Sequence, residues 1–263
     1  MIDQVTATTF HRFLDNGRTT PAIFSCKDRK TGDAGEYVVK LRGGMERRER
    51  GLTCELYASM LGAYFGMSCP RAAIVLIEED LANVIGEELS GDDGKAEIIR
   101  ESIGLNFGTQ FLTNLTVWPV DKPVLGPMQD AATKVFAFDA LIQNPDRTFN
   151  NPNLGSRNED LFIFDHELGF SFLLDIFPSR TPWKLETEDY LGRHVFARAL
   201  NHVPFPADFL QRLSGLSQEV FAYFSEQVPN GWKSEDLPKI ESHLALMSEH
   251  AAEFAEEVTR RLA

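Results

Sequence analysis

The hydrophobic pattern of this chain changes character along its length, and that change limits the folds it can adopt. Short apolar runs predict strands over Ala22–Cys26 and Glu36–Leu41, joined as an antiparallel hairpin by a polar turn that contains glycine. Much later, apolar residues recur at helical spacing and predict amphipathic helices over Phe209–Val228 and Ile240–Leu262. We therefore expect an α+β protein whose first part is β-rich and whose second part is mainly helical.

The same patterns predict further elements between these regions. A helix carrying Glu55 has Leu52, Leu56 and Met60 on one face and ends at Gly66. Pro145 ends a long helix, because proline disfavours helical geometry in the residue before it. The predicted elements change from mainly strands to mainly helices near residue 115, so we expect two lobes, 1–115 and 116–263. The remaining predicted elements are strands at Ala72–Ile77, Val84–Glu88, Gly108–Leu112 and Leu161–Phe164 and the long helix itself at Met128–Gln143.

Composition excludes several classes of protein. With 43% hydrophobic and 25% charged residues the chain can bury a sizeable core, and its net charge of 26 − 39 = −13 argues against nucleic acid as a partner. Cys26, Cys54 and Cys69 form no metal-binding spacing, and their odd number favours reduced thiols. The N-terminus does not have a signal-peptide pattern, and no apolar run is long enough to span a membrane. We expect a cytoplasmic protein that makes no membrane contact.

A polar loop after the long helix carries the residues that most strongly suggest chemistry. Asp146 precedes Asn151 by 151 − 146 = 5 positions, the D-x-x-x-x-N spacing of a kinase catalytic loop. Asp165 follows the strand Leu161–Phe164, which returns it toward that loop. Carboxylate and amide oxygens are the ligands that Mg²⁺ prefers, so Asn151 and Asp165 are candidate metal ligands. Asn150 is an alternative to Asn151, although the spacing favours Asn151.

Residues of the first lobe are candidates for phosphate binding. Lys40 ends a predicted strand, where a lysine contacts nucleotide phosphates in kinases, and Glu55 on the next helix is placed to hold its ammonium. Each has an ordinary alternative, as a solvated edge lysine and a glutamate that faces water. A turn before the first predicted strand is a less specific candidate, because it has neither a P-loop nor a G-x-G-x-x-G pattern. Its residues are Gly17, Arg18, Thr19 and Thr20.

Two further polar residues have mainly structural interpretations. Asp139 lies within an apolar helical stretch, so if buried it requires a partner such as Arg147 or a backbone amide. His166 directly follows Asp165, and we expect it to pack or to bond the loop rather than to act as a base. The stretch Phe111–Leu115 is either a hinge between lobes or a plain strand and turn.

Several segments together resemble the HipA-like kinases. The similarity runs in order through residues 10 to 170, and its central motifs are Phe138-Asp-Ala-Leu-Ile-Gln-Asn-Pro-Asp-Arg147, Asn151-Pro-Asn153 and Phe164-Asp-His-Glu-Leu-Gly169. The resemblance implies a bilobal protein-kinase-like fold, ATP and Mg²⁺ as cofactors, and Asp146 as base or hydroxyl-orienting group. It also implies that Asn151 and Asp165 hold metal and that Lys40 contacts phosphate. The chain has neither the N-terminal domain nor the Ala-His-Gly-Lys-Asn loop of HipA toxins, so we carry over neither toxin activity nor an antitoxin partner.

The combined pattern predicts a kinase that uses ATP and Mg²⁺ to phosphorylate a hydroxyl group, on a serine or threonine of a protein. A kinase of small molecules is one alternative, because fold does not fix substrate. A catalytically silent nucleotide-binding module is another. A structural protein with chance motif matches would bind no nucleotide at all.

Overall fold

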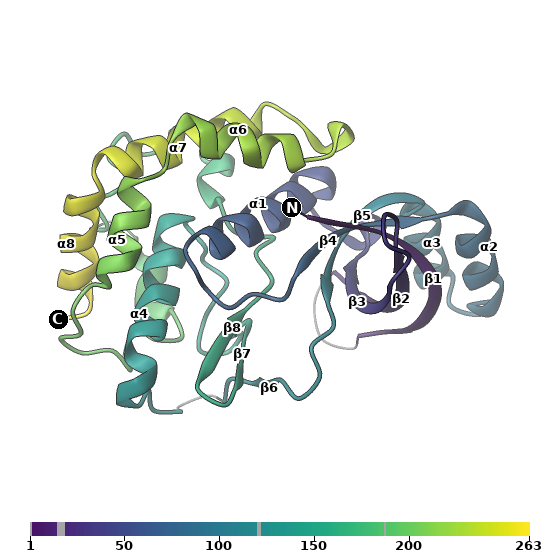
Figure 1. Ribbon diagram of the computed structural model, residues 1–263, viewed down its shortest axis with the longest axis horizontal. Helices are drawn as coiled ribbons and strands as arrows, with labels where there is room; N and C mark the ends of the chain where they lie inside the picture. Colours follow the sequence, from purple (N-terminus) through teal and green to yellow (C-terminus); the bar gives the residue numbers. More distant parts are fainter. Residues whose placement is uncertain (1, 15–18, 120–121, 187) are drawn as a thin grey trace. The chain divides into compact units, whose positions relative to one another are not determined.

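A computed structural model describes residues 2–14, 19–119, 122–186 and 188–263, and its contacts divide the chain into two compact units (Figure 1). Unit 1 comprises Met1–Leu56 and Pro70–Thr113, and unit 2 comprises Tyr57–Cys69 and Asn114–Ala263. The helix α1 (Arg48–Tyr64) contributes its first part to unit 1 and its last part to unit 2. The assignment of phosphate binding to lobe 1–115 and of the catalytic and metal-binding loops to lobe 116–263 stays a prediction.

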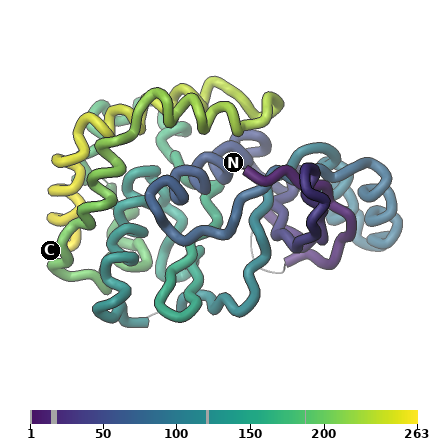
Figure 2. The backbone as a smooth tube through the Cα atoms, in the orientation of Figure 1, coloured from purple at the N-terminus to yellow at the C-terminus, as the bar shows by residue number. Residues whose placement is uncertain are grey.

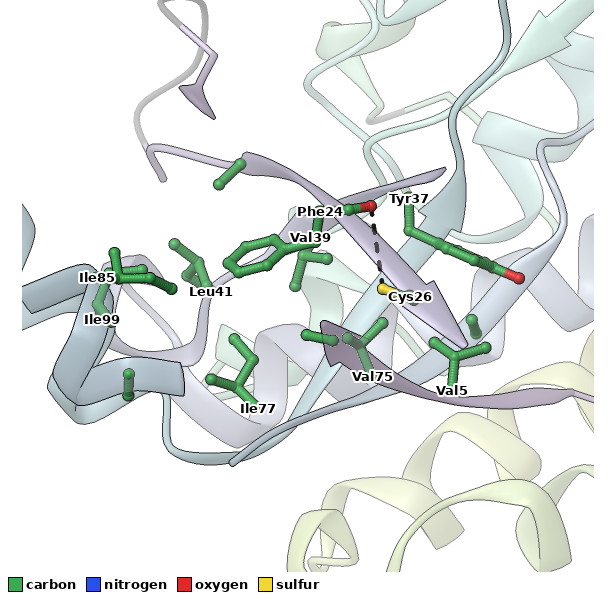
Figure 3. Packing of buried hydrophobic residues seen from close by; sticks show 14 residues of the cluster. Val5, Phe24, Cys26, Tyr37, Val39, Leu41, Val75, Ile77, Ile85 and Ile99 are labelled. Atoms are coloured by element: carbon green, nitrogen blue, oxygen red, sulfur yellow. Dashed lines mark hydrogen bonds between the residues drawn. The ribbon is translucent and has the colours of Figure 1, made fainter. Parts of the chain in front are cut away.

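Unit 1 is built on a closed five-stranded barrel in the order β1-β2-β3-β5-β4. All neighbouring strands pair antiparallel except β1 and β4, which are parallel. The barrel encloses alternate side chains of its strands, including those of Val5, Phe24, Val39 and Val75, with the Cys26 thiol against the Phe24 carbonyl (Figure 3). The strands are β1 (Asp3–Phe13), β2 (Ala22–Asp28), β3 (Ala34–Lys40), β4 (Ala72–Ile77) and β5 (Gly104–Gln110).

The predicted hairpin is confirmed, and Lys40 is the last residue of β3. The predicted strand Val84–Glu88 is wrong, because these residues belong to the helix α2 (Glu79–Glu88). Ala82 and Ile85 are buried there while Val84 is 53% exposed, which is helical periodicity and not strand alternation. A second unpredicted helix, α3 (Asp93–Glu101), lies beside α2 in unit 1 (Figure 1).

Unit 2 is mainly helical and contains one small sheet in the order β6-β7-β8. The expected helices after residue 200 are present, but each is divided in two, at Gly215 and at His250. Helices α5, α7 and α8 pack on one another (Figure 2). The elements are β6 (Thr116–Val117), α4 (Gly126–Leu141), β7 (Leu154–Arg157), β8 (Asp160–Ile163), α5 (Ala207–Ser214), α6 (Gln218–Gln227), α7 (Asp236–Glu249) and α8 (Ala251–Arg261).

The expected sheet-rich first part and helical second part are confirmed. Short 3₁₀ turns complete the chain, at η1 (Arg42–Gly44), η2 (Ser171–Leu174), η3 (Asp189–Arg193) and η4 (Asn230–Trp232). The three cysteines carry thiols and no disulfides, and burial raises the pKa of Cys26 and of Cys69 to about 12, which makes both unreactive packing residues. Within the described ranges, no helix has the length and apolar character needed to cross a bilayer.

Candidate functional site

The structure brings Lys40 and Glu55 together in unit 1. Lys40 Nζ lies 3.3 Å from Glu55 Oε1, and their side chains are 11% and 1% exposed. The pairing of Lys40 with Phe107 across β3 and β5 fixes the backbone of the lysine, while α1 supplies the glutamate. A glutamate as buried as this one requires a cation to stay ionised, so the pair fixes the ammonium of Lys40 near α1.

The turn predicted to bind phosphate lies partly outside the described residues. Gly17 and Arg18 fall in the segment that the structure does not describe, whereas Thr19 is buried and Thr20 has a left-handed backbone with φ of 49°. Gly44 approaches this turn closely, because a Cβ atom on it would lie 2.5 Å from the Thr19 carbonyl oxygen. Thr19 therefore lies against the η1 segment that follows Lys40 along the chain.

In unit 2 the carboxylate of Asp146 is held by two asparagine side chains. Its Oδ2 accepts hydrogen bonds from Asn151 Nδ2 at 2.9 Å and from Asn153 Nδ2 at 2.8 Å. The Asp146 amide in turn donates to Asn144 Oδ1 at 3.1 Å. The structure thus places Asn151 beside Asp146, as the five-residue spacing predicts, while Asn150 is exposed and takes no part in these bonds.

The expected partner of the buried Asp139 is confirmed. Asp139 is fully buried in α4, and its Oδ2 accepts from Arg147 Nε at 2.5 Å and from His194 Nε2 at 2.9 Å. Burial opposes ionisation, but the charge of Arg147 and the His194 hydrogen bond outweigh it and hold the pKa of Asp139 below its ordinary value. The Phe196 amide donates to His194 Nδ1 at 3.1 Å, so the imidazole proton is on Nε2 and points to Asp139.

Phe164 separates Asp165 from the last residue of β8, Ile163, and Asp165 adopts a left-handed backbone with φ of 61°. The residue before it, Phe164, donates its amide to the Asn153 carbonyl at 3.3 Å. Aspartate tolerates this backbone region better than most residues, so the chain can turn at Asp165 without glycine. The metal-binding role of Asp165 stays a prediction. His166 is buried with its ring 5.8 Å from that of Phe138, as expected for a packing residue.

Comparison with known proteins decides the family. The family model for HipA-like kinases matches residues 8–259, which is nearly the whole chain. The chain belongs to the HipA-like kinase family. It is therefore a phosphotransferase. The search among curated proteins found no match.

Solved structures support the same fold for this HipA-like kinase. The crystal structure of the Helicobacter pylori proinflammatory kinase CtkA matches with a TM-score of 0.52 and 11% sequence identity. The match covers 100% of this chain and 98% of that one. At this identity the likeness concerns the fold alone.

Sequence reasoning about this HipA-like kinase missed Asn153, which bonds Asp146, and His194, which bonds Asp139. Asn153 is buried and bonds Asp146 as closely as Asn151 does. Its φ of 42° belongs to the left-handed region that asparagine tolerates, so its residue type was a usable signal. His194 is far from Asp139 in the sequence, and no local pattern connects them. Among the described residues no three or more His, Cys, Asp or Glu side chains form a group that could hold a metal ion.

Proposed function

We propose that this HipA-like kinase has the bilobal protein-kinase-like fold and uses ATP and Mg²⁺ to phosphorylate a serine or threonine hydroxyl of a protein. The observation that carries the proposal is the carboxylate of Asp146, which two asparagine amides fix in place within a family of kinases. Transfer of a phosphoryl group depends mainly on positioning and charge, and needs little covalent chemistry from the protein.

Asp146 is the residue that would orient the acceptor hydroxyl or take its proton. The hydrogen bonds that the structure records for its side chain engage Oδ2, which leaves Oδ1 for the hydroxyl. The two donors are neutral amides, so they fix the carboxylate without cancelling its charge.

Asn151 and Asp165 are suited to hold Mg²⁺. The Asp146 carboxylate can only accept hydrogen bonds, so the Asn151 amide must face it with Nδ2, and Oδ1 is then directed to another partner. Amide and carboxylate oxygens are the ligands that Mg²⁺ takes. A bound Mg²⁺ would neutralise phosphate charge and align the phosphates for transfer. Lys40, held by Glu55, would add a positive charge to nucleotide phosphates.

Two substitutions test this function. Asp146→Asn and Asp165→Asn should each lower phosphate transfer from ATP, including autophosphorylation, by at least about a hundredfold. Positioned acid–base groups such as Asp146 contribute about 10² to 10⁴, and Asp165→Asn would remove a carboxylate ligand of the Mg²⁺ that neutralises phosphate charge. The thermal transition should stay nearly unchanged, since both side chains are partly exposed. Asp160→Asn is the matched control, because Asp160 is an exposed carboxylate of the same unit. Full activity in both site variants would refute the proposal.

Nucleotide binding and acceptor class need separate measurements. Calorimetric titration with a non-hydrolysable ATP analogue should show binding that Mg²⁺ strengthens, and Asp165→Asn should remove the Mg²⁺ effect. Binding without any transfer to protein or to small molecules would identify a silent nucleotide-binding module. Transfer to metabolites but not to protein would identify a small-molecule kinase. No binding at all would contradict the nucleotide site itself.

A further inference from the structure

Arg147, the residue after Asp146, is a fully buried cation whose donors reach three segments of unit 2. Its Nε donates to Asp139 Oδ2 at 2.5 Å. Its Nη1 donates to the main-chain carbonyls of Asn153 and of Phe164, the latter at 3.2 Å. One planar side chain therefore connects a helix, the end of the catalytic loop and the end of strand β8.

Both carbonyls belong to residues that adjoin the proposed site. Asn153 bonds the Asp146 carboxylate through its side chain at 2.8 Å, and Phe164 is joined by a peptide bond to Asp165. The Asn153 carbonyl also accepts from the Phe164 amide at 3.3 Å, so these two segments are already adjacent when the guanidinium contacts them. We infer that Arg147 is a positioning residue that holds Asp146 and Asp165 in a fixed relation by binding the Asn153 and Phe164 carbonyls. This inference rests on the proposed function.

Asp139 fixes the orientation of the guanidinium. Its two oxygens accept from Arg147, from His194 and from Asn144, whose Nδ2 lies 2.8 Å from Oδ1. The Oδ1 atom of Asn144 also accepts a hydrogen bond from the Asp146 amide at 3.1 Å. Through Asn144, the Asp139 carboxylate therefore also supports the beginning of the loop that carries Asp146. A buried carboxylate with this many partners stays ionised and has one orientation.

Lysine cannot take over this role. An ammonium is a compact point charge, whereas the guanidinium has donors at fixed angles along a planar fork. A lysine at position 147 could neutralise Asp139 but could not also reach two carbonyls on the other side of the fork. Arg147→Lys therefore keeps the positive charge beside Asp139 but removes the hydrogen bonds to the Asn153 and Phe164 carbonyls.

The test measures geometry and activity together in the full chain. In Arg147→Lys, hydrogen–deuterium exchange of peptides spanning residues 148–165 should be faster than in wild type. The kcat for phosphate transfer should fall by about 10–100-fold, and the Mg²⁺ concentration for half-maximal activity should rise, as is typical when the groups that orient metal ligands are changed. Affinity for the ATP analogue without Mg²⁺ should stay the same.

A matched control separates positioning from simple destabilisation. Arg261 likewise donates to main-chain carbonyls, those of Leu185 at 3.1 Å and Glu188 at 3.2 Å, in another part of unit 2. Arg261→Lys should lower the thermal transition without changing kcat per folded molecule, the Mg²⁺ requirement or exchange over residues 148–165.

Unchanged kcat, Mg²⁺ requirement and exchange in folded Arg147→Lys would overturn the inference. If that variant does not fold, the double variant Asp139→Asn/Arg147→Gln removes both charges and should fold, because no buried charge is left unpaired and an amide side chain remains beside His194 and Asn144. It should show the same loss of kcat and the same faster exchange, and wild-type values in it would overturn the inference. An inactive wild type would count against the proposed function, and the exchange measurement would still decide the role of Arg147.

Discussion

Both units contain an ion pair whose side chains are almost completely buried, and the two pairs have different geometry. In unit 1, Lys40 lies 3.3 Å from Glu55 and its side chain is 11% exposed. In unit 2, Arg147 lies 2.5 Å from Asp139 and both side chains are 0% exposed. The lysine brings a point charge on a flexible stem, and the arginine brings a rigid fork of donors. The first pair is suited to offering a cation to a ligand and the second to holding backbone in place.

This difference matters for how each pair contributes to stability. A buried ion pair gains stability over apolar side chains only where further hydrogen bonds offset the desolvation of both charges. Asp139 and Arg147 have such bonds, to His194, to Asn144 and to two carbonyls. We therefore expect the Asp139–Arg147 pair to contribute to the stability of unit 2. The Lys40–Glu55 pair should matter for the chemistry of unit 1.

The largest effect should come from breaking the pair of unit 2. Asp139→Asn leaves the buried Arg147 without its counterion, and breaking a buried pair in this way costs about 3–5 kcal/mol. Chemical denaturation should show this loss in the free energy of unfolding. Asp208→Asn is the control, because it removes a pair with Lys134 at 2.7 Å in which Asp208 is 54% exposed, and such pairs contribute about 0–1 kcal/mol. Equal losses in the two variants would show that burial of the pair does not matter.

Acid should also weaken unit 2 through its histidines. Burial lowers the pKa of His243 to about 4, against the opposing effect of the bond from its Nε2 to the Leu141 carbonyl at 2.8 Å. Unfolded histidine binds a proton near pH 6.5, so the stabilising effect is complete above that pH and is lost as the pH falls toward 4. Burial likewise lowers the pKa of His194.

Between pH 7.5 and pH 5, His243 should account for a loss of about 2 kcal/mol of stability. His243→Gln should remove that part of the pH dependence in denaturation experiments, and the part due to His194 should remain. His202→Asn, at an exposed position with φ of 54°, is the control for removing a histidine that is not buried. A pH profile identical in wild type and His243→Gln would contradict the assignment.

Local patterns predicted much of the fold, and non-local pairing explains what they missed. The hairpin of β2 and β3 was predictable because its turn and its alternation lie within one short stretch. Strand β1 was not predicted, since its residues are largely polar and it pairs in parallel with β4, far along the chain. The segment Val84–Glu88 suggested a strand, but burial of Ala82 and Ile85 selected a helix.

In the candidate site, too, contacts between residues close in sequence were predictable and contacts between distant residues were not. Asp146 and Asn151, and likewise Asp139 and Arg147, were predictable as neighbours because each pair is separated by a few residues in one loop or at a helix end. His194 was not, because it reaches Asp139 from a segment 55 positions later. Spacing alone also favoured Asn151 and gave no weight to Asn153, which only the backbone of the loop brings to the same carboxylate.

The smallest effect on stability should come from removing the pair of unit 1 altogether. Lys40→Met combined with Glu55→Leu replaces two buried charges with apolar side chains of similar size, a change that is often neutral in free energy. The single variant Lys40→Met should be less stable than the double variant, because it leaves a glutamate that is 1% exposed without this cation.

The binding of nucleotide should show the opposite trend. If Lys40 contacts phosphates, both Lys40→Met and the double variant should bind the ATP analogue at least about tenfold more weakly, which corresponds to about 1.4 kcal/mol. Calorimetric titration at constant Mg²⁺ measures this directly, with Lys134→Met as a control that removes a lysine of an exposed pair in unit 2. Wild-type affinity in the double variant would remove Lys40 from the nucleotide site. If the double variant Lys40→Met/Glu55→Leu lost as much stability as Asp139→Asn does, the ion pairs of both units would be needed for folding.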